Sequence, residues 1–334
     1  MKKLLKEKNK IIIGLIFGLV LIALWLKFID VSQMVNYFKK VNPLWIIASM
    51  VLYLSAYFIR SIRWQIILSP VEKISVKQAF NLFMAGMLVN YIIPIRAGEI
   101  AKSFFLKGLK KTPVSKSLPT VFIDKMMDLF PIIILLLLLP FVPIRLSSFL
   151  IWGLMILLVI FLVFVGIIII SLYYSVSVSN WLKIWFFWLP KRFKSRVNDF
   201  IHLFVEGLGV VKENKNNAGS IILLTILAIL FDAGYIIGMF QAFDYQIAFL
   251  VALFGYTLIN LSYILPTPPA QIGTNEAIYI IIFTFAFGID KNLVSATLGF
   301  AHLLTGSLIF LVGSIALQYL NSNLIQALSL NHRT

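Results

Sequence analysis

Residues 76–99 read VKQAFNLFMAGMLVNYIIPIRAGE, an apolar stretch that runs into Pro94 and then into Arg96 and Glu99. A short helical pattern follows to about residue 108. Proline removes a backbone donor and clashes with the preceding turn, so the first helix should break at Pro94. The sequence therefore predicts a helical hairpin at 76–108 that is broken in its middle.

The composition places this hairpin in a lipid bilayer. Of the 334 residues 60% are hydrophobic and only 13% charged, and the mean hydropathy is +0.97. Soluble domains carry about a quarter charged residues, so a soluble protein is excluded. A net charge of +16 fits Lys and Arg in cytoplasmic loops rather than a nucleic-acid partner. With no Cys and three His, we expect no disulfide, no metal and no other cofactor.

A second apolar region has the same character as the first. Residues 247–265 run into PTPPAQIG at 266–273, and a short helix should follow at 274–287. Non-helical backbone at membrane depth persists only where it is buried in protein or lines a wet cavity. The breaks of the hairpins at 76–108 and 247–288 are expected at Pro94, Gly98, Pro266, Pro268 and Gly273.

The remaining apolar runs are long enough to cross a bilayer as single helices. A transmembrane helix needs about 20 mostly apolar residues. Six runs satisfy this requirement, at 11–29, 44–64, 118–142, 149–172, 220–243 and 293–318.

The distribution of Lys and Arg decides whether the two hairpins cross the membrane. If residues 76–93 crossed, the basic segments 96–116 and 173–219 would both lie outside the cell. If each hairpin instead leaves on the side that it entered, both basic segments lie in the cytoplasm with both termini, as the positive-inside rule favours. We therefore expect two re-entrant hairpins in the cytoplasmic membrane.

The predicted order is span, span, hairpin, span, and then the same order again with the opposite orientation. The sequence thus predicts an all-α polytopic membrane protein built as an inverted-topology repeat, a plan found in transporters. The first repeat covers 1–142, the second 143–319, and residues 320–334 form a cytoplasmic tail.

The linker between the repeats contains two helical patterns, at 180–212, that are expected to lie at the membrane interface. Trp181, Trp185 and Trp188 recur at helical spacing before the basic cluster Lys191, Arg192, Lys194 and Arg196. Tryptophan at headgroup level and cations facing anionic lipid are typical of such helices. We interpret the linker as an anchor on an anionic lipid surface rather than a substrate site.

The charged residues at the first break are candidates for headgroup binding. Arg96 can donate two parallel hydrogen bonds to a phosphate, and a helix N-terminus favours an anion. Glu99 follows it and could pair with Lys102 three residues later. The alternative is that Arg96 and Glu99 only neutralise each other.

Acids and a base recur in the predicted spans. Asp124 and Asp128 share one helical face, and Lys125 reaches Asp128 at a spacing of three. They could hold a headgroup amine, relay a proton or close a local pair. Asp232 has no local partner, so it must find one across the bundle or be protonated, which makes it a candidate relay.

The second hairpin has its own candidates. Glu276 opens the predicted helix, with Asn275 beside it as a further binding residue and Thr274 and Asn275 as caps. His302 in the last span is expected to be a hydrogen-bonded packing residue.

Three motifs resemble those of the flippase-like membrane proteins that include the membrane portion of lysylphosphatidylglycerol synthase. They are NYIIPIRAGE at 90–99, DKMMD at 124–128 and LPTPPAQIGTNE at 265–276. Lys125 stands where that family usually has Arg, and Pro269-Ala270 stand where it favours glycines. The similarity extends over nearly the whole chain.

The resemblance implies movement of a phospholipid or polyprenyl-phosphate lipid across the bilayer without a nucleotide-driven motor. It places the phosphate at Arg96 and Lys125, with Glu99, Asp128 and Glu276 meeting headgroup cations or orienting those bases. The family's aminoacyl transferase is a separate domain after the membrane part, so no enzymatic lipid aminoacylation is expected within these 334 residues.

Two other functions are compatible with the residues alone. One is a proton- or cation-coupled transporter of a small solute, with Asp124, Asp128, Asp232 and Glu276 as its relay. The other is a membrane partner of a lipid-modifying enzyme, held through the basic linker. Assembly into a homo-oligomer is left open.

Overall fold

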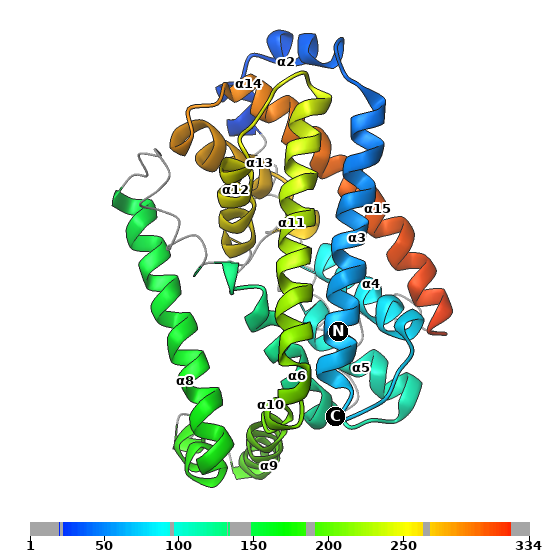
Figure 1. Ribbon diagram of the computed structural model, residues 1–334, viewed down its shortest axis with the longest axis vertical. Coiled ribbons are helices and arrows are strands. Elements are labelled where there is room, and N and C mark those ends of the chain that lie inside the picture. The colour runs from blue at the N-terminus through cyan, green and yellow to red at the C-terminus, as the bar shows by residue number, and fades with distance from the viewer. Residues whose placement is uncertain are drawn as a thin grey trace.

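A computed structural model of the chain describes residues 20, 23–93, 97–131, 133, 148–184, 191–262 and 268–321 (Figure 1). All regular elements in these ranges are helices. The prediction of an all-α protein is therefore confirmed for the described part of the chain.

Two long antiparallel helices form the centre of the molecule (Figure 1). They are α3, Pro43–Leu68, and α11, Ala218–Ala242. Asn42 caps α3 through its side chain, and its own backbone N–H donates to the Ala242 carbonyl at 2.8 Å, which ties one end of the pair together. With a third segment, Lys291–Tyr319, these are the described helices long and apolar enough to cross a membrane.

The first broken region folds as a helical hairpin. Its arms are α4, Val76–Ile92, and α5, Gly98–Lys110, so the helix does break where the proline predicts. The arms can meet closely because Gly98 has no side chain. A Cβ there would lie 1.9 Å from the Gly86 carbonyl oxygen. The Thr112 hydroxyl donates to the Glu72 carboxylate at 2.8 Å, so the chain returns to the level at which it entered the hairpin.

The second broken region is built from α12, Phe249–Ser262, a 3₁₀ turn η3, Pro269–Gln271, α13, Thr274–Tyr279, and a π-helical turn η4, Ile280–Ala286. The returning arm packs on α12 because Gly255 leaves room for the Phe283 ring. Whereas α4 follows the C-terminal end of α3, α12 follows that of α11, so the two hairpins start from opposite ends of the central pair (Figure 1).

The predicted capping of the second hairpin is wrong. Gly273, at φ +75°, occupies the N-cap position of α13, and no side-chain cap hydrogen bond forms there. Ala270 and Gln271 also have positive φ, at 54° and 57°. The chain turns through this left-handed backbone before α13, which leaves Thr274 and Asn275 inside the helix instead of in front of it.

The last segment closes the bundle on the first hairpin. It comprises α14, Lys291–Val294, a π-helical turn η5, Ser295–Gly299, and α15, Phe300–Tyr319. Tyr91 lies against Gly306 and Leu88 against Gly313, so α15 packs antiparallel to α4. At the start of this segment Asn292 accepts from the Asp30 backbone, next to α2, Val31–Phe38.

The remaining helices lie in the chain between α5 and α11. They are α6, Val114–Met127, α8, Ser148–Ile184, with a kink at Tyr174, α9, Lys191–Gly207, α10, Val210–Glu213, and the 3₁₀ turn η2, Lys215–Asn217. Helix α6 ends at Met127, four residues before Pro131, because in a continuous helix the proline ring would clash with the Met127 carbonyl. Most of the predicted span 11–29, residues 132 and 134–142 of the predicted span 118–142, and the tail beyond 321 lie outside the described residues.

The linker helices pack on protein along part of their apolar side. Phe204 of α9 contacts the Phe122 ring at 5.9 Å between centroids, and Gly207 lies against Pro119 of α6. Ile201 and Val205 are buried against α8. Trp185 and Trp188 and the side chains of residues 191–196 lie outside the described part, so the membrane-surface role of the linker stays a prediction.

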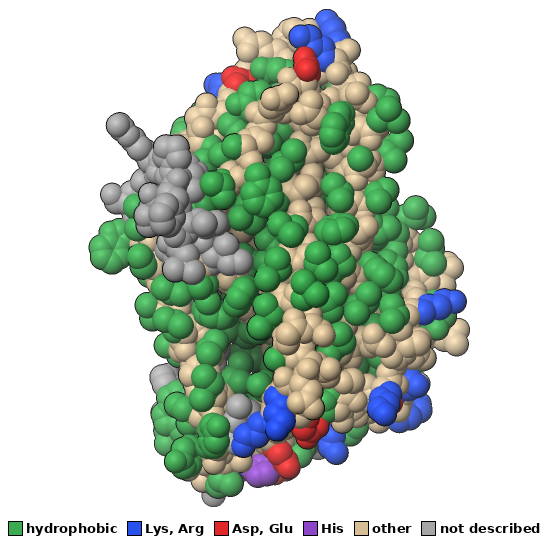
Figure 2. Space-filling model, viewed as in Figure 1, with side chains coloured by type: hydrophobic (Ala, Val, Ile, Leu, Met, Phe, Trp, Pro, Cys, Tyr) green, Lys and Arg blue, Asp and Glu red, His purple; other side chains and the backbone are tan. Residues whose placement is uncertain are grey.

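The surface has the pattern of a protein that lies in a bilayer. Figure 2 shows apolar side chains over the middle of one face and charged side chains gathered at its two ends. Large apolar residues such as Leu44, Trp152 and Leu303 are more than two-thirds exposed. Surfaces like this are unfavourable in water and normal against lipid.

Candidate functional site

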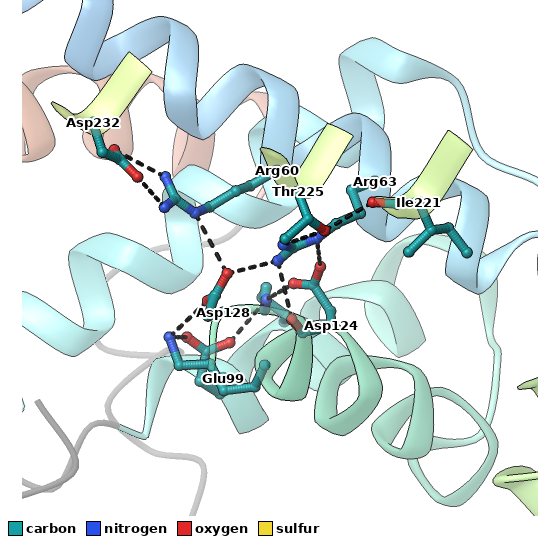
Figure 3. Close-up of polar contacts among 10 residues, drawn as sticks. Arg60, Arg63, Glu99, Asp124, Asp128, Ile221, Thr225 and Asp232 are labelled. Carbon is teal, nitrogen blue, oxygen red and sulfur yellow. Dashed lines mark hydrogen bonds and ion pairs between the residues drawn. The ribbon is translucent and has the colours of Figure 1, made fainter. Parts of the chain in front are cut away.

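Eight charged side chains from four helices form one connected group, which we name the ion cluster (Figure 3). They come from α3, α5, α6 and α11 and are Arg60, Arg63, Glu99, Lys102, Asp124, Lys125, Asp128 and Asp232. Charges at membrane depth are costly, and they mark functional sites by default.

Arg63 is the most enclosed cation of the ion cluster, with 1% of its side chain exposed. Its Nε donates to Asp124 Oδ1 at 2.8 Å, and its Nη2 donates to Asp128 Oδ1 at 2.7 Å. The backbone oxygen of Asp124 and the Thr225 hydroxyl accept two further bonds, at 3.0 and 3.2 Å. Its guanidinium thus joins α3, α6 and α11.

Arg60 lies one helical turn before Arg63 and is the ion-pair partner of Asp232. Both Asp232 oxygens accept from the Arg60 guanidinium, and Asp128 lies 3.5 Å from Arg60 Nε. The prediction that Asp232 needs a partner from across the bundle is met by this pair. Sequence reasoning missed both arginines as site residues, although two arginines three apart in an apolar helix are a signal of intramembrane charge.

Lys102 lies on α5 and is buried inside the first hairpin, with 3% of its side chain exposed. Its Nζ lies 2.8 Å from Glu99 and 3.7 Å from Asp124, and 4.2 Å from the centre of the Phe83 ring. Gly86 provides the space for its stem, because a Cβ there would lie 2.7 Å from Lys102 Cγ. The predicted Glu99–Lys102 pair is present, and it is part of a larger network.

Lys125 is the most accessible cation of the ion cluster, with 52% of its side chain exposed. It lies 3.2 Å from Asp128, as its spacing predicted, and 3.7 Å from Glu99. The other cations of the cluster are at most 9% exposed. An anion that approaches the cluster from water therefore meets Lys125 first.

The ion cluster is balanced, with four cations and four carboxylates. Each carboxylate has at least one basic partner. An added anion would make the group negative, and a buried net charge is strongly unfavourable. A site for phosphate therefore needs a further cation, and Arg96, three residues before Glu99, is the candidate in the sequence. Arg96 itself lies outside the described residues.

A cavity of about 90 Å³ lies beside the ion cluster and between the two hairpins. Arg60, Glu99, Lys125 and Asp128 line it from one side. Asn275 and His302 line it from the side of the second hairpin, and six tyrosines form much of the wall between: Tyr53, Tyr57, Tyr91, Tyr235, Tyr256 and Tyr279.

The break of the first hairpin is held by Asn90. Its Oδ1 accepts from the Gly98 backbone N–H at 2.7 Å, and its Nδ2 donates to Glu99 at 3.4 Å. These bonds satisfy a helix-start donor that the break leaves free. The close contact with Gly86 requires glycine at position 98. Pro94 lies outside the described residues.

The predicted residues of the second hairpin lie across the cavity, away from the ion cluster. Glu276 Oε1 is 2.6 Å from His302 Nδ1, and Asn275 donates to Gln271 at 2.9 Å. Pro268 and Gly273 flank the turn before α13, whereas Pro266 is outside the described part. The structure therefore brings together Glu99, Lys102, Asp124, Lys125, Asp128 and Asp232, and separates them from Asn275 and Glu276.

The described residues contain no group of three or more His, Cys, Asp or Glu side chains that could hold a metal ion. The site consists instead of ion pairs beside a small polar cavity in a helical, lipid-facing protein. These features define a polytopic membrane protein with intramembrane charge. The chain belongs to the family of the lysylphosphatidylglycerol synthase transmembrane region, whose model matches residues 11–313.

Curated relatives agree with this membership. The chain is 23% identical to a UPF0104 membrane protein of Methanothermobacter thermautotrophicus over 97% of this chain and 99% of that protein. It is 25% identical to a UPF0104 membrane protein of Methanocaldococcus jannaschii over 38% of this chain and 37% of that one. Glycosyltransferase AglD of Haloferax volcanii is 21% identical over 36% of this chain and 20% of its own length. No solved structure gives a significant match.

Proposed function

We propose that this protein moves a phosphate-bearing, anionic lipid across the cytoplasmic membrane. The observation that carries the proposal is a polar cavity between two hairpins that start from opposite ends of the bundle, with the ion cluster along one wall. Discontinuous helices that meet near the midplane are typical of substrate sites in transporters. The headgroup would pass through the cavity while the acyl chains remain in lipid.

We also propose that the chain crosses the membrane six times and forms two re-entrant hairpins. The Glu72–Thr112 hydrogen bond supports entry and exit of the first hairpin at one level. The ends of α4, α5 and α6 at that level carry the lysines Lys73, Lys77, Lys107, Lys110, Lys111 and Lys116. This concentration favours the cytoplasmic side for that end of the bundle.

Labelling of an introduced cysteine tests the hairpin. Lys111 directly follows α5, and the chain has no native Cys, so Lys111→Cys gives a single label site. We expect a membrane-impermeant thiol reagent to react from the cytoplasmic face of oriented vesicles and not from outside. Asp244→Cys, after α11 at the other end of the bundle, is the control and should react from outside. Labelling of Lys111→Cys only from outside, together with labelling of Asp244→Cys from the cytoplasmic face, would contradict the re-entrant topology and is the pattern expected if the hairpin crosses the membrane.

The ion cluster suggests how the headgroup is held. Lys125 would contact the phosphate first, because it is half exposed and borders the cavity. Arg96 would supply the charge that the balanced cluster lacks, through paired hydrogen bonds. The ion pairs of Asp128 and Glu99 with Lys125 would weaken as the phosphate binds. We expect the lipid to be moved without chemical change.

Headgroup exposure in proteoliposomes tests the function. Fluorescent lipids with anionic and with zwitterionic headgroups are incorporated, and a membrane-impermeant quencher reports the fraction in the outer leaflet over time. We expect protein-dependent movement of the anionic lipid at a rate at least about tenfold above that in protein-free liposomes. Folded protein that moves no phosphate-bearing lipid, including a polyprenyl phosphate, would contradict the proposal.

A second candidate follows from the similarity to a glycosyltransferase. Because 36% of this chain matches AglD, the protein could serve as the membrane partner of an enzyme that modifies a lipid headgroup. This role predicts that reconstituted protein moves no lipid alone and that a lipid-modifying enzyme copurifies with it.

A further inference from the structure

The pair formed by Glu276 and His302 is separate from the ion cluster, and the headgroup contacts proposed for that cluster do not include it. His302 projects from α15 and is 5% exposed. Its Nδ1 lies 2.6 Å from Glu276 Oε1, and its Nε2 lies 2.8 Å from the backbone oxygen of Ala270. The ring thus joins the last long helix to both sides of the turn in the second hairpin.

The two contacts fix the number of protons that the pair holds. A carbonyl oxygen only accepts, so Nε2 must carry a hydrogen. The contact between Nδ1 and Oε1 then needs one further proton, carried either by the carboxyl group or by the imidazole. In both forms the pair is neutral overall. Loss of that proton to water in the cavity leaves a carboxylate facing a nitrogen lone pair, with a net charge of −1.

The surroundings of the pair do not offset that charge. In the part of the chain that the structure describes, no Lys or Arg forms an ion pair with Glu276. Glu276 Oε2 is buried, and no described residue gives it a hydrogen bond. The titratable groups nearest on neighbouring elements are Tyr91 of α4, whose ring meets His302 at 6.3 Å, and Tyr279 of α13. Burial of a carboxylate without a partner is strongly unfavourable, and the proton shared between Oε1 and Nδ1 is what keeps the pair neutral.

The pair shares its cavity with the proposed headgroup site. His302 lines the same space as the charged residues Arg60, Glu99, Lys125 and Asp128. Those charges balance one another, so loss of the proton from Glu276 and His302 lowers by one unit the net charge that an entering headgroup meets, against the positive charge proposed for Arg96. An anionic headgroup is repelled by the deprotonated pair and accepted by the protonated pair.

We propose that Glu276 and His302 form a binding site for one proton and that this proton must be bound for an anionic headgroup to occupy the cavity. The inference rests on the proposed lipid movement and adds its coupling to protons. Linkage is reciprocal, so the headgroup in turn favours the bound proton.

Two measurements on the full chain test this proposal independently. The first follows the ¹⁵N signals of histidine in the labelled protein in detergent micelles; the chain has three histidines, so His302→Gln assigns the signal. We expect the His302 signal to change with pH in one protonation step. Glu276→Gln should move that step, whereas Glu206→Gln should not. Glu206 is the matched control, since it lies 3.9 Å from the exposed His202 on α9. Absence of any His302 step would overturn the site, whether or not lipid moves.

The second measurement is the rate of anionic lipid movement as a function of pH. We expect the wild-type rate to fall about tenfold with rising pH across the step seen in the His302 signal, because one full charge changes beside the headgroup site. Glu276→Gln leaves the pair neutral where the deprotonated wild-type pair has a charge of −1, so its rate at high pH should stay close to the wild-type rate at low pH, whereas Glu206→Gln should behave as wild type. Equal pH dependence in Glu276→Gln and wild type would overturn the coupling. Wild-type protein that moves no lipid, with an intact His302 step, would contradict the proposed function and the coupling while leaving the proton site in place.

Discussion

Replacement of Arg63 by Ala is expected to unfold the protein or to cost about 3–5 kcal/mol of stability, as is typical when one partner of a buried ion pair is removed. Arg63 satisfies Asp124 and Asp128 at 2.8 and 2.7 Å. Its loss leaves both acids with fewer cations in a site that lipid surrounds. The thermal midpoint of the purified protein in detergent measures the effect.

Two variants separate this effect from a general loss of charge. Lys107→Ala removes a cation from an exposed position of α5 and should change the midpoint little. The double variant Arg63→Gln with Asp124→Asn removes one charge of each sign and should recover part of the lost stability. If Arg63→Ala melts at the temperature of Lys107→Ala, the ion cluster does not hold α3 and α6 together.

Replacement of Gly98 by Ala is expected to open the first hairpin and to abolish lipid movement. The added Cβ would lie 1.9 Å from the Gly86 carbonyl oxygen and 2.6 Å from Asn90 Oδ1. Overpacking of this kind costs about 1–3 kcal/mol, and more where backbone must shift. Separation of α4 and α5 would also pull Glu99 and Lys102 away from Asp124. Thermal melting and the lipid assay together measure both consequences.

Gly108→Ala is the matched control, because it lies on the same helix with nothing within 4 Å of its added Cβ. Alanine in an exposed helix interior is favoured over glycine by about 0.5–1 kcal/mol. This variant should therefore be as stable as wild type or slightly more so, with normal lipid movement. Equal behaviour of the two glycine variants would contradict the close contact at Gly86.

The sequence predicted the helical class and the positions of the breaks, because proline and long apolar runs act locally. The end of α4 at Ile92 and the start of α5 at Gly98 follow from the one proline between them. Pairings within one helix, such as Lys125 with Asp128, were likewise accessible from spacing alone.

The partners across the bundle could not be predicted in the same way. In the sequence, Arg60 and Arg63 resemble the charged end of a span. Only the fold shows that α11 brings Asp232 and Thr225 beside them. The pairing of His302 with Glu276 needs the turn of η3, whose left-handed residues Ala270 and Gln271 are not the glycines that usually signal such backbone. Side-chain contacts between distant segments depend on packing, and one sequence does not reveal it.

The most direct test of the central claim compares headgroup exposure of an anionic lipid in proteoliposomes that contain wild-type protein, Arg96→Ala or Lys107→Ala. The claim is that a phosphate crosses beside the balanced ion cluster with Arg96 as its added cation. It predicts protein-dependent movement in wild type and in Lys107→Ala, and a loss of about tenfold to a hundredfold in Arg96→Ala, the scale of a hydrogen bond to a charged group. Movement by folded Arg96→Ala at the wild-type rate would contradict it.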